Sequence, residues 1–295
     1  MSFGYQILGF GSGGVALASV SVSGNTETTV GSYTVQTYLG SGNFTVTGSL
    51  ACDVLCVAGG GGGSSGHYGS GAGAGGMRTT SSTLTGSYTI TVGGGGALQG
   101  TFNQDGNKGS DSSVGSLLAC TGGAKSSYFV AGYDGGSGGG GSGNSSSGGD
   151  GNEGGYDPAE GSNGGNASAA YGQGGGGGHS EAGENTSNYV GGNGGDGSAN
   201  AYRTGSNVTY AGGGGGSAYR EDVASSEDTN QCLGGAGGGG KGGDYWEGGN
   251  SPATGGSANT GGGAGGCEGH AGNDQDGPAG GSGIVVIRYL TASVA

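Results

Sequence analysis

Residues 58–76 read AGGGGGSSGHYGSGAGAGG, a run of glycine broken by a short polar and aromatic insert, and this pattern recurs through most of the chain. Glycine accounts for 89 of the 295 residues. The tracts are separated by inserts rich in Ser, Asn and Tyr, and they lie at 58–63, 71–76, 93–96, 135–141, 148–155, 172–178, 191–197, 211–216, 234–243, 255–266 and 277–283. Any fold of this chain has to accommodate them.

Composition alone favours disorder, because each glycine loses about 1–2 kcal/mol of backbone entropy when it is fixed. The regular alternation of tracts with inserts, and the strand patterns that flank them, argue for an ordered array. Collagen is excluded by the three prolines and the missing Gly-X-Y period. An α-helix is disfavoured by glycine's low propensity, and a glycine strand has no side chains to set its register.

The remaining regular conformation is polyglycine II, which has three residues per turn and rises about 3.1 Å per residue. Its N–H and C=O groups point outward, so parallel rods can bond to one another through the backbone, each bond contributing a net ~0.5–1.5 kcal/mol. A Cβ facing a neighbouring rod would hold the two apart. We therefore expect glycine inside such a bundle and polar side chains around it.

The strand patterns predict an all-β fold: a small, jelly-roll-like β-sandwich with the polyglycine-II bundle inserted between its strands. The sandwich comprises 15–57 and 284–295, together with 87–92 and 117–130, and the bundle is 58–283. We expect Ile284–Leu290 to lie beside Cys52–Val57 and so tie the two ends of the array together. Shorter strand candidates are Val20–Val22, Tyr33–Tyr38, Asn43–Thr47, Ser87–Val92, Leu117–Cys120 and Tyr128–Val130, with a hairpin signal at Gly40–Gly42.

Charge and hydropathy narrow the function classes. The net charge is −14, from 7 basic and 21 acidic residues, so nucleic-acid binding is not expected. The acidic residues are interpreted as a solubility device, with cation binding as the alternative. No apolar stretch approaches the length of a membrane span, and no basic residue precedes Val15–Val20, so neither membrane insertion nor a signal peptide is expected.

Five cysteines leave at least one thiol free or bonded to another chain. Cys52 and Cys56 share one face of the expected strand but lie about 13 Å apart along it, which is too far for a disulfide. Cys232 and Cys267 both flank glycine tracts and could pair.

Residues 1–14 form an apolar, glycine-containing segment that either packs on its own domain or attaches to another subunit or a larger particle. The candidate docking residues are Phe3, Tyr5, Ile7, Leu8 and Phe10.

Several stretches together resemble glycine-rich proteins of bacteriophage particles. They are Gly42–Val46, Asp53–Gly63, Gly73–Arg78, Ser87–Gly94 and Gly280–Tyr289. The alternation of strand and glycine tract is similar to the tail-fibre tip adhesins of T-even-type phages, and Gly4–Gly11 resembles the start of small marine-phage virion proteins. The pattern also resembles the glycine-rich region of anaplastic lymphoma kinase, a jelly roll with glycine helices inserted.

The phage resemblance implies a non-enzymatic virion protein, a fibre, tail-tip or capsid-surface appendage, that displays loops for host attachment. It implies other virion proteins, a host surface glycan or protein, and further copies of the chain, with a trimer favoured, as partners. The alternative is a secreted fibril, matrix or ice-binding protein, although an ice-binding face would need regular Thr or Ala arrays. An enzyme is the least favoured reading, and no cofactor or catalytic residue is predicted.

Motifs for other chemistry are weak. GxGxxG runs arise from glycine content, and none opens a helix. Gly191–Ala199 partly matches a calcium-binding β-roll repeat, and Asp274–Gly277 is a fragment of an EF-hand loop, but neither is complete, so no metal site is predicted. The three histidines fall in separate inserts, and a spatial Ser–His–Asp site is not expected.

The tyrosines of the inserts are the best binding candidates, because Tyr with Ser, Gly and Asn is the composition of adaptable binding loops and because aromatic rings stack on sugars. The alternative role is to cover the ends and flanks of the bundle. The candidate receptor-binding residues are Tyr156, Tyr189, Tyr219, Tyr245 and Trp246.

Overall fold

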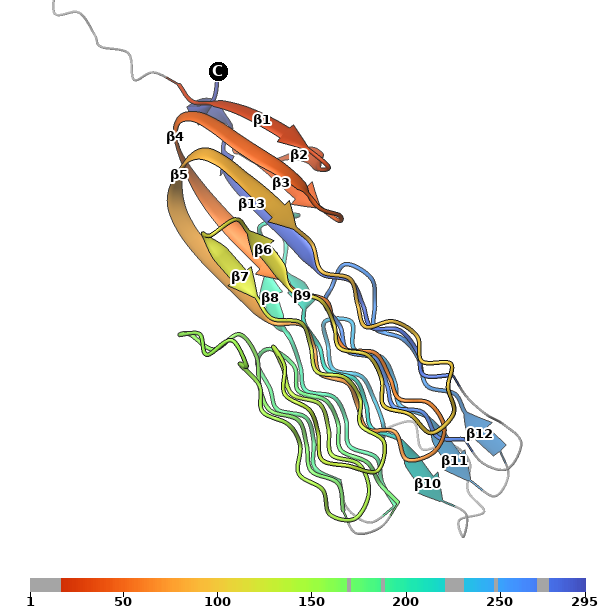
Figure 1. The fold of residues 1–295 in the computed structure, drawn as a ribbon. Coiled ribbons are helices and arrows are strands. Elements are labelled where there is room, and N and C mark those ends of the chain that lie inside the picture. The colour runs from red at the N-terminus through yellow and green to blue at the C-terminus, as the bar shows by residue number, and fades with distance from the viewer. Residues whose placement is uncertain (1–16, 169–170, 187–188, 221–230, 247–248, 270–275) are drawn as a thin grey trace, which may run out of the picture.

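The computed structural model describes residues 17–168, 171–186, 189–220, 231–246, 249–269 and 276–295. A curved β-sheet occupies one end of an elongated molecule, and the glycine tracts run away from it side by side to a distal end that carries β10–β12 (Figure 1). No α-helix occurs among these residues; the helical structure they contain is the short 3-10 helix Thr291–Ser293. No helix of these residues has the length and apolar character that crossing a bilayer requires. The predicted docking residues Phe3, Tyr5, Ile7, Leu8 and Phe10 lie outside the described residues.

One large antiparallel sheet dominates the fold, in the order β2-β3-β13-β4-β5-β6-β7, with β1 pairing β4. Two small sheets, β10-β11-β12 and β8-β9, lie within the glycine array. The strands are β1 Ser19–Ser23, β2 Thr26–Val30, β3 Tyr33–Tyr38, β4 Gly42–Val57, β5 Met77–Thr91, β6 Ser112–Val114, β7 Leu118–Cys120, β8 Ser198–Asn200, β9 Val208–Tyr210, β10 Ala218–Arg220, β11 Asp244–Trp246, β12 Gly249–Ser251 and β13 Ile284–Leu290.

The last strand joins the two ends of the glycine array, as predicted. β13 lies between β3 and β4, with Ile284 opposite Val57 and Val285 opposite Tyr38. Its residues Ile284–Ile287 are fully buried, because the sheet is covered on both faces. The first tract therefore leaves the sheet, and the last tract returns to it, at neighbouring positions.

The expected sandwich is a single sheet that bends over itself. β4 and β5 are long, and their pairing shifts register between Val46 and Leu50, around a glycine at φ +95°. Beyond this bulge the two halves of the sheet face each other, so that Phe44 packs against Tyr289 with ring centroids 6.2 Å apart. Bulges of this kind increase the local bend of a strand pair.

Three local predictions differ from the structure. Cys52–Val57 and Asn43–Thr47 belong to one continuous strand, β4. Gly40–Gly42 does not close a hairpin, because β13 separates β3 from β4. Tyr128–Val130 is not a strand; it turns at the distal end, with Phe129 at φ +57°.

The glycine tracts are held by backbone hydrogen bonds to three different neighbours in rotation. In the first tract, Ala58 and Gly61 donate to residues 76 and 73, Gly59 and Gly62 donate to 110 and 107, and Gly60 and Gly63 donate to 281 and 278, over 2.8–3.0 Å. Every third N–H thus reaches the same neighbour. The same three-neighbour pattern recurs in 172–178. Its N–H groups donate in turn to carbonyl groups in 214–217, 138–141 and 181–184.

The tract 71–76 is surrounded on all sides. Its N–H groups donate to the tracts containing 121–124, 174–177 and 261–264, and its carbonyls accept from those containing 58–61, 137–140 and 214. A lattice of main-chain bonds fills the place of an apolar core here. Added methyl groups do not fit at most of these contacts: a Cβ on Gly73 would overlap the carbonyl oxygen of Ser137.

Polar side chains complete the hydrogen bonding at the flanks of the bundle. Asp196 Oδ1 accepts from the N–H of Ala236 at 2.7 Å, and Asn193 Oδ1 accepts from that of Leu233 at 2.8 Å. Asp111 does the same for Gly122 at 2.8 Å. Outer tracts lack a neighbouring carbonyl on one side, so these side chains supply the acceptor for N–H groups that no other tract can satisfy. Many of the acidic and amide residues therefore have a structural task.

All five cysteines are buried free thiols. Cys52, Cys56 and Cys120 lie in the core between the two halves of the sheet. Cys232 and Cys267, whose pairing the sequence left open, are not joined.

Candidate functional site

The distal end carries a continuous set of aromatic contacts, which we call the distal ring cluster. Successive turns of the glycine array bring these rings together; segments far apart in sequence, such as Gly69 with Tyr128 and Gly172 with Ala218, meet through isolated β-bridges. The cluster consists of His67, Tyr68, Phe102, Tyr128, Phe129, Tyr171, Tyr189, Tyr219 and Tyr245.

Stacked tyrosines form the exposed part of the cluster. Tyr171 stacks on Tyr189 with centroids 5.6 Å apart and planes at 24°, and on Tyr68 at 5.7 Å with the same angle. Tyr171 and Tyr189 are 43% and 41% exposed, and Phe129 is 46% exposed. Large apolar rings exposed together at one end of a molecule are typical of interaction surfaces.

A buried ion pair supports the rings from below. Arg220 at the end of β10 donates to both carboxylate oxygens of Asp244 at the start of β11; the Nε–Oδ1 distance is 3.1 Å. The two strands run parallel, which also stacks Tyr219 on Tyr245 at 5.3 Å and 11°. Because both charged groups are almost fully buried, each depends on the other for compensation.

Glu268 is a second buried carboxyl group beneath the cluster. Its Oε2 accepts from the N–H of Tyr68 at 3.0 Å and from the hydroxyl of Ser217 at 3.2 Å, while its Oε1 has no hydrogen-bond partner among the described residues. His67 Nδ1 lies 3.5 Å from Oε1, which would favour the carboxylate, but the contact is long. Burial therefore has the larger effect on this carboxyl group, and it raises the pKa of Glu268 to about 8.

The structure brings three of the five predicted binding residues together. Tyr189, Tyr219 and Tyr245 belong to the distal ring cluster, although Tyr219 is only 7% exposed. The backbone of Trp246 follows Tyr245 in β11. Tyr156 lies at the opposite end of the bundle, where its ring covers the guanidinium of Arg78 at 3.9 Å.

Sequence reasoning passed over six of the nine members of the cluster. Tyr68, Phe102, Phe129 and Tyr171 are in inserts of the same composition as the chosen ones, and nothing in that composition marks the distal end. The direction of each tract could have found them: a tract that leaves the sheet must end distally, and the next one must return.

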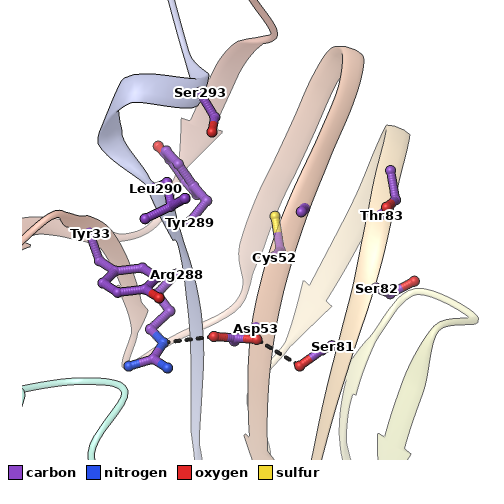
Figure 2. Close-up of a pocket in the computed structure, with 11 residues that line it drawn as sticks. Tyr33, Cys52, Asp53, Ser81, Ser82, Thr83, Arg288, Tyr289, Leu290 and Ser293 are labelled. Carbon is purple, nitrogen blue, oxygen red and sulfur yellow. Dashed lines mark hydrogen bonds and ion pairs between the residues drawn. The ribbon is translucent and has the colours of Figure 1, made fainter.

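A pocket of about 440 Å³ opens in the large sheet, where β13 and β4 separate beyond the pairing of Arg288 with Asp53 (Figure 2). Arg288 Nε donates to Asp53 Oδ2 at 2.9 Å, and Ser81 donates to Oδ1 at 2.6 Å. The guanidinium also lies over the rings of Tyr33 and Tyr202. These contacts join the β8–β9 hairpin to the sheet, so both charges are already used within the fold.

The remaining polar groups do not assemble a catalytic or metal-binding set in the described chain. His179 Nδ1 is 2.6 Å from Ser198 Oγ, but no carboxylate of the described residues completes a triad, and burial lowers the pKa of this imidazole. No group of three or more His, Cys, Asp or Glu residues suited to a metal was found there. The Asp of the partial β-roll match, Asp196, accepts from a backbone N–H instead. Asp274 and His270 lie outside the described residues.

Comparison with known proteins places the chain by its sequence. A family described as a glycine-rich domain matches residues 36–290. The chain belongs to this family. The match thus covers both the sheet from β3 onward and the whole glycine array, so both parts belong to one glycine-rich domain. Among curated proteins, no sequence matches this glycine-rich domain protein.

Proposed function

We propose that the protein is a structural component of a bacteriophage particle, a fibre, tail-tip or capsid-surface appendage, that presents the distal ring cluster to the host surface. The observation that carries the proposal is the exposure of stacked tyrosines at the end of the molecule opposite the sheet. Ala18 pairs with Val294 at the sheet end, so both described chain ends lie far from the rings. Such polarity suits a protein attached at one end and binding at the other.

The glycine tracts are proposed to be polyglycine-II helices that make a rigid platform for this surface. The rotation of hydrogen bonds among three neighbours supports this interpretation, because three residues per turn direct every third N–H to the same side. A rigid support reduces the entropy lost when the displayed rings bind.

The binding partner is proposed to be a surface glycan or protein of the host cell. Exposed tyrosines offer flat apolar faces with a polar hydroxyl, and they lose little conformational entropy on binding. On the attachment side, we propose that Phe3, Tyr5, Ile7, Leu8 and Phe10 dock on other virion proteins, and that copies of the chain associate, with a trimer favoured.

Two experiments test the proposal. Mass spectrometry of purified virions should find the chain in the particle; its presence only in filaments secreted by cells would favour a fibril or matrix protein instead. Labelled protein should bind whole cells of the host on which the phage grows.

The cell-binding assay has a matched control within the chain. Y171A/Y189A should lose at least tenfold in affinity, because the two exposed stacked tyrosine rings are removed, whereas Y156A should bind like the wild type, because its ring is at the opposite end. Equal binding by all three proteins, with thermal denaturation showing each to be folded, would refute the attachment role.

A further inference from the structure

Two cysteines meet at the place where the sheet passes into the glycine array. Cys56 is the penultimate residue of β4, and Cys120 is the last residue of β7. The Cys120 thiol donates to the backbone carbonyl of Cys56 at 3.2 Å. Both residues are buried, at 0% and 1% exposure, within the core that the two halves of the bent sheet enclose.

The segments that follow these cysteines are neighbours in the bundle. Gly123 donates to the carbonyl of Gly59 at 2.8 Å, and Ser126 donates to that of Gly62 at 3.1 Å. A covalent bond between the two cysteines would therefore hold the bases of two adjacent tracts at a fixed separation. The 63 residues between them include all of β5 and three glycine tracts, 58–63, 71–76 and 93–96.

The other thiols do not share this arrangement. Cys52 donates to the carbonyl of Leu50, two residues away, at 3.6 Å. Cys267 donates to the carbonyl of Asp276 at 3.2 Å, and Cys232 lies against Gly191 in the distal half of the array.

We propose that Cys56 and Cys120 form a disulfide when the chain folds under oxidising conditions. Two S–H bonds break and one S–S bond forms between the cysteines. The two electrons and two protons pass to an oxidant such as oxidised glutathione, whose own S–S bond breaks to give two molecules of reduced glutathione. The inference does not depend on the attachment role, and it needs only an extracellular or otherwise oxidising setting.

The surroundings of the pair decide when the bond forms. Burial, together with the neighbouring Cys56, raises the pKa of the Cys120 thiol well above its ordinary value. The reactive thiolate is therefore scarce in the folded protein. Oxidation accordingly takes place during folding, before the two halves of the sheet close over the pair.

The test is to refold the reduced chain in a glutathione redox buffer and to count thiols in denaturant. Wild-type protein should lose two of its five thiols. Trypsin should then release a product linking residues 1–78 to 109–125, which dithiothreitol separates. The denaturation midpoint of the oxidised protein should exceed that of the reduced protein, because the bond restricts the unfolded chain.

Serine variants distinguish this pair from the other thiols. Cys52→Ser should still give the linked product, and Cys56→Ser and Cys120→Ser should not. Five free thiols in the refolded wild type, a bond between Cys232 and Cys267 alone, or an unchanged linked product in Cys120→Ser would each overturn the proposal. Because the thiol count is made in denaturant, it is informative even for a variant of lowered stability.

Discussion

Gly73→Ala is the substitution that bears most directly on the glycine lattice. Gly73 lies in the tract that six others surround; its N–H donates to Ala124 and its carbonyl accepts from Gly61, both at 2.9 Å. A methyl group at this position would overlap the backbone of Ser137, so the tract 135–141 has to move away. Backbone cannot rotate aside as a flexible side chain would.

The size of the effect follows from the bonds at that contact. The tract 135–141 donates to 71–76 twice, from Ser137 to Ala74 at 3.0 Å and from Gly140 to Gly71 at 2.9 Å. Losing both would cost about 1–3 kcal/mol in net terms. Strain from overpacking adds about 1 kcal/mol or more. We expect the free energy of unfolding to fall by about 2–4 kcal/mol.

Urea denaturation followed by circular dichroism measures this change, and Gly94→Ala is the matched control. Gly94 lies in a glycine tract, but a Cβ there meets no atom within 4 Å. We expect Gly94→Ala to be neutral or to stabilise by up to about 1 kcal/mol, because it restricts the unfolded chain. If both variants unfolded within about 0.5 kcal/mol of the wild type, close main-chain packing would not be what holds the tracts together.

Two further substitutions test the distal end. Asp244→Ala should destabilise the protein by about 3–5 kcal/mol, because it leaves the Arg220 guanidinium buried and unpaired. The double variant Arg220→Met/Asp244→Leu should recover most of this loss, because it removes both charges. Equal destabilisation by the single and double variants in urea denaturation would contradict a role for the ion pair. Glu268→Gln should alter the pH dependence of stability. Burial raises the pKa of Glu268 from its ordinary value near 4.5 to about 8 in the folded protein. The stabilising contribution of the protonated carboxyl group is therefore complete at pH values below 4.5, and it is lost as the pH rises through 8. The stability of the wild type relative to Glu268→Gln should therefore fall between pH 5 and 9; a constant difference would mean that the carboxyl group titrates normally.

The strands were the predictable part of the fold, because the pattern of apolar and polar side chains along a strand indicates which of them are buried. Tyr33–Tyr38 and Ile284–Leu290 were predicted with the bounds that the structure has. The proximity of Ile284–Leu290 to Cys52–Val57 was also predicted, from the continuous apolar pattern of the two strands. The bend in the sheet was not predictable. It depends on a register shift after Val46, and the short loop at Gly40–Gly42 wrongly suggested a hairpin.

The choice of binding residues was limited by a different cause. Glycine has no side chain, so a tract carries no sign of its direction or its neighbours, and inserts of similar composition turn at opposite ends of the bundle. Tyr156 and Tyr171 illustrate this: the two inserts look alike in sequence, but one ring packs on Arg78 beside the sheet and the other is exposed at the distal end.

Amide hydrogen exchange of 71–76, followed by NMR, tests the central claim most directly. These residues belong to no helix or strand, yet each of their N–H groups donates to the carbonyl of another tract at 2.8–3.0 Å. We predict that they exchange as slowly as the amides of Val54–Val57 in β4, because both open only when the fold does. Complete exchange within minutes, while β4 remains protected, would contradict cohesion through the main chain.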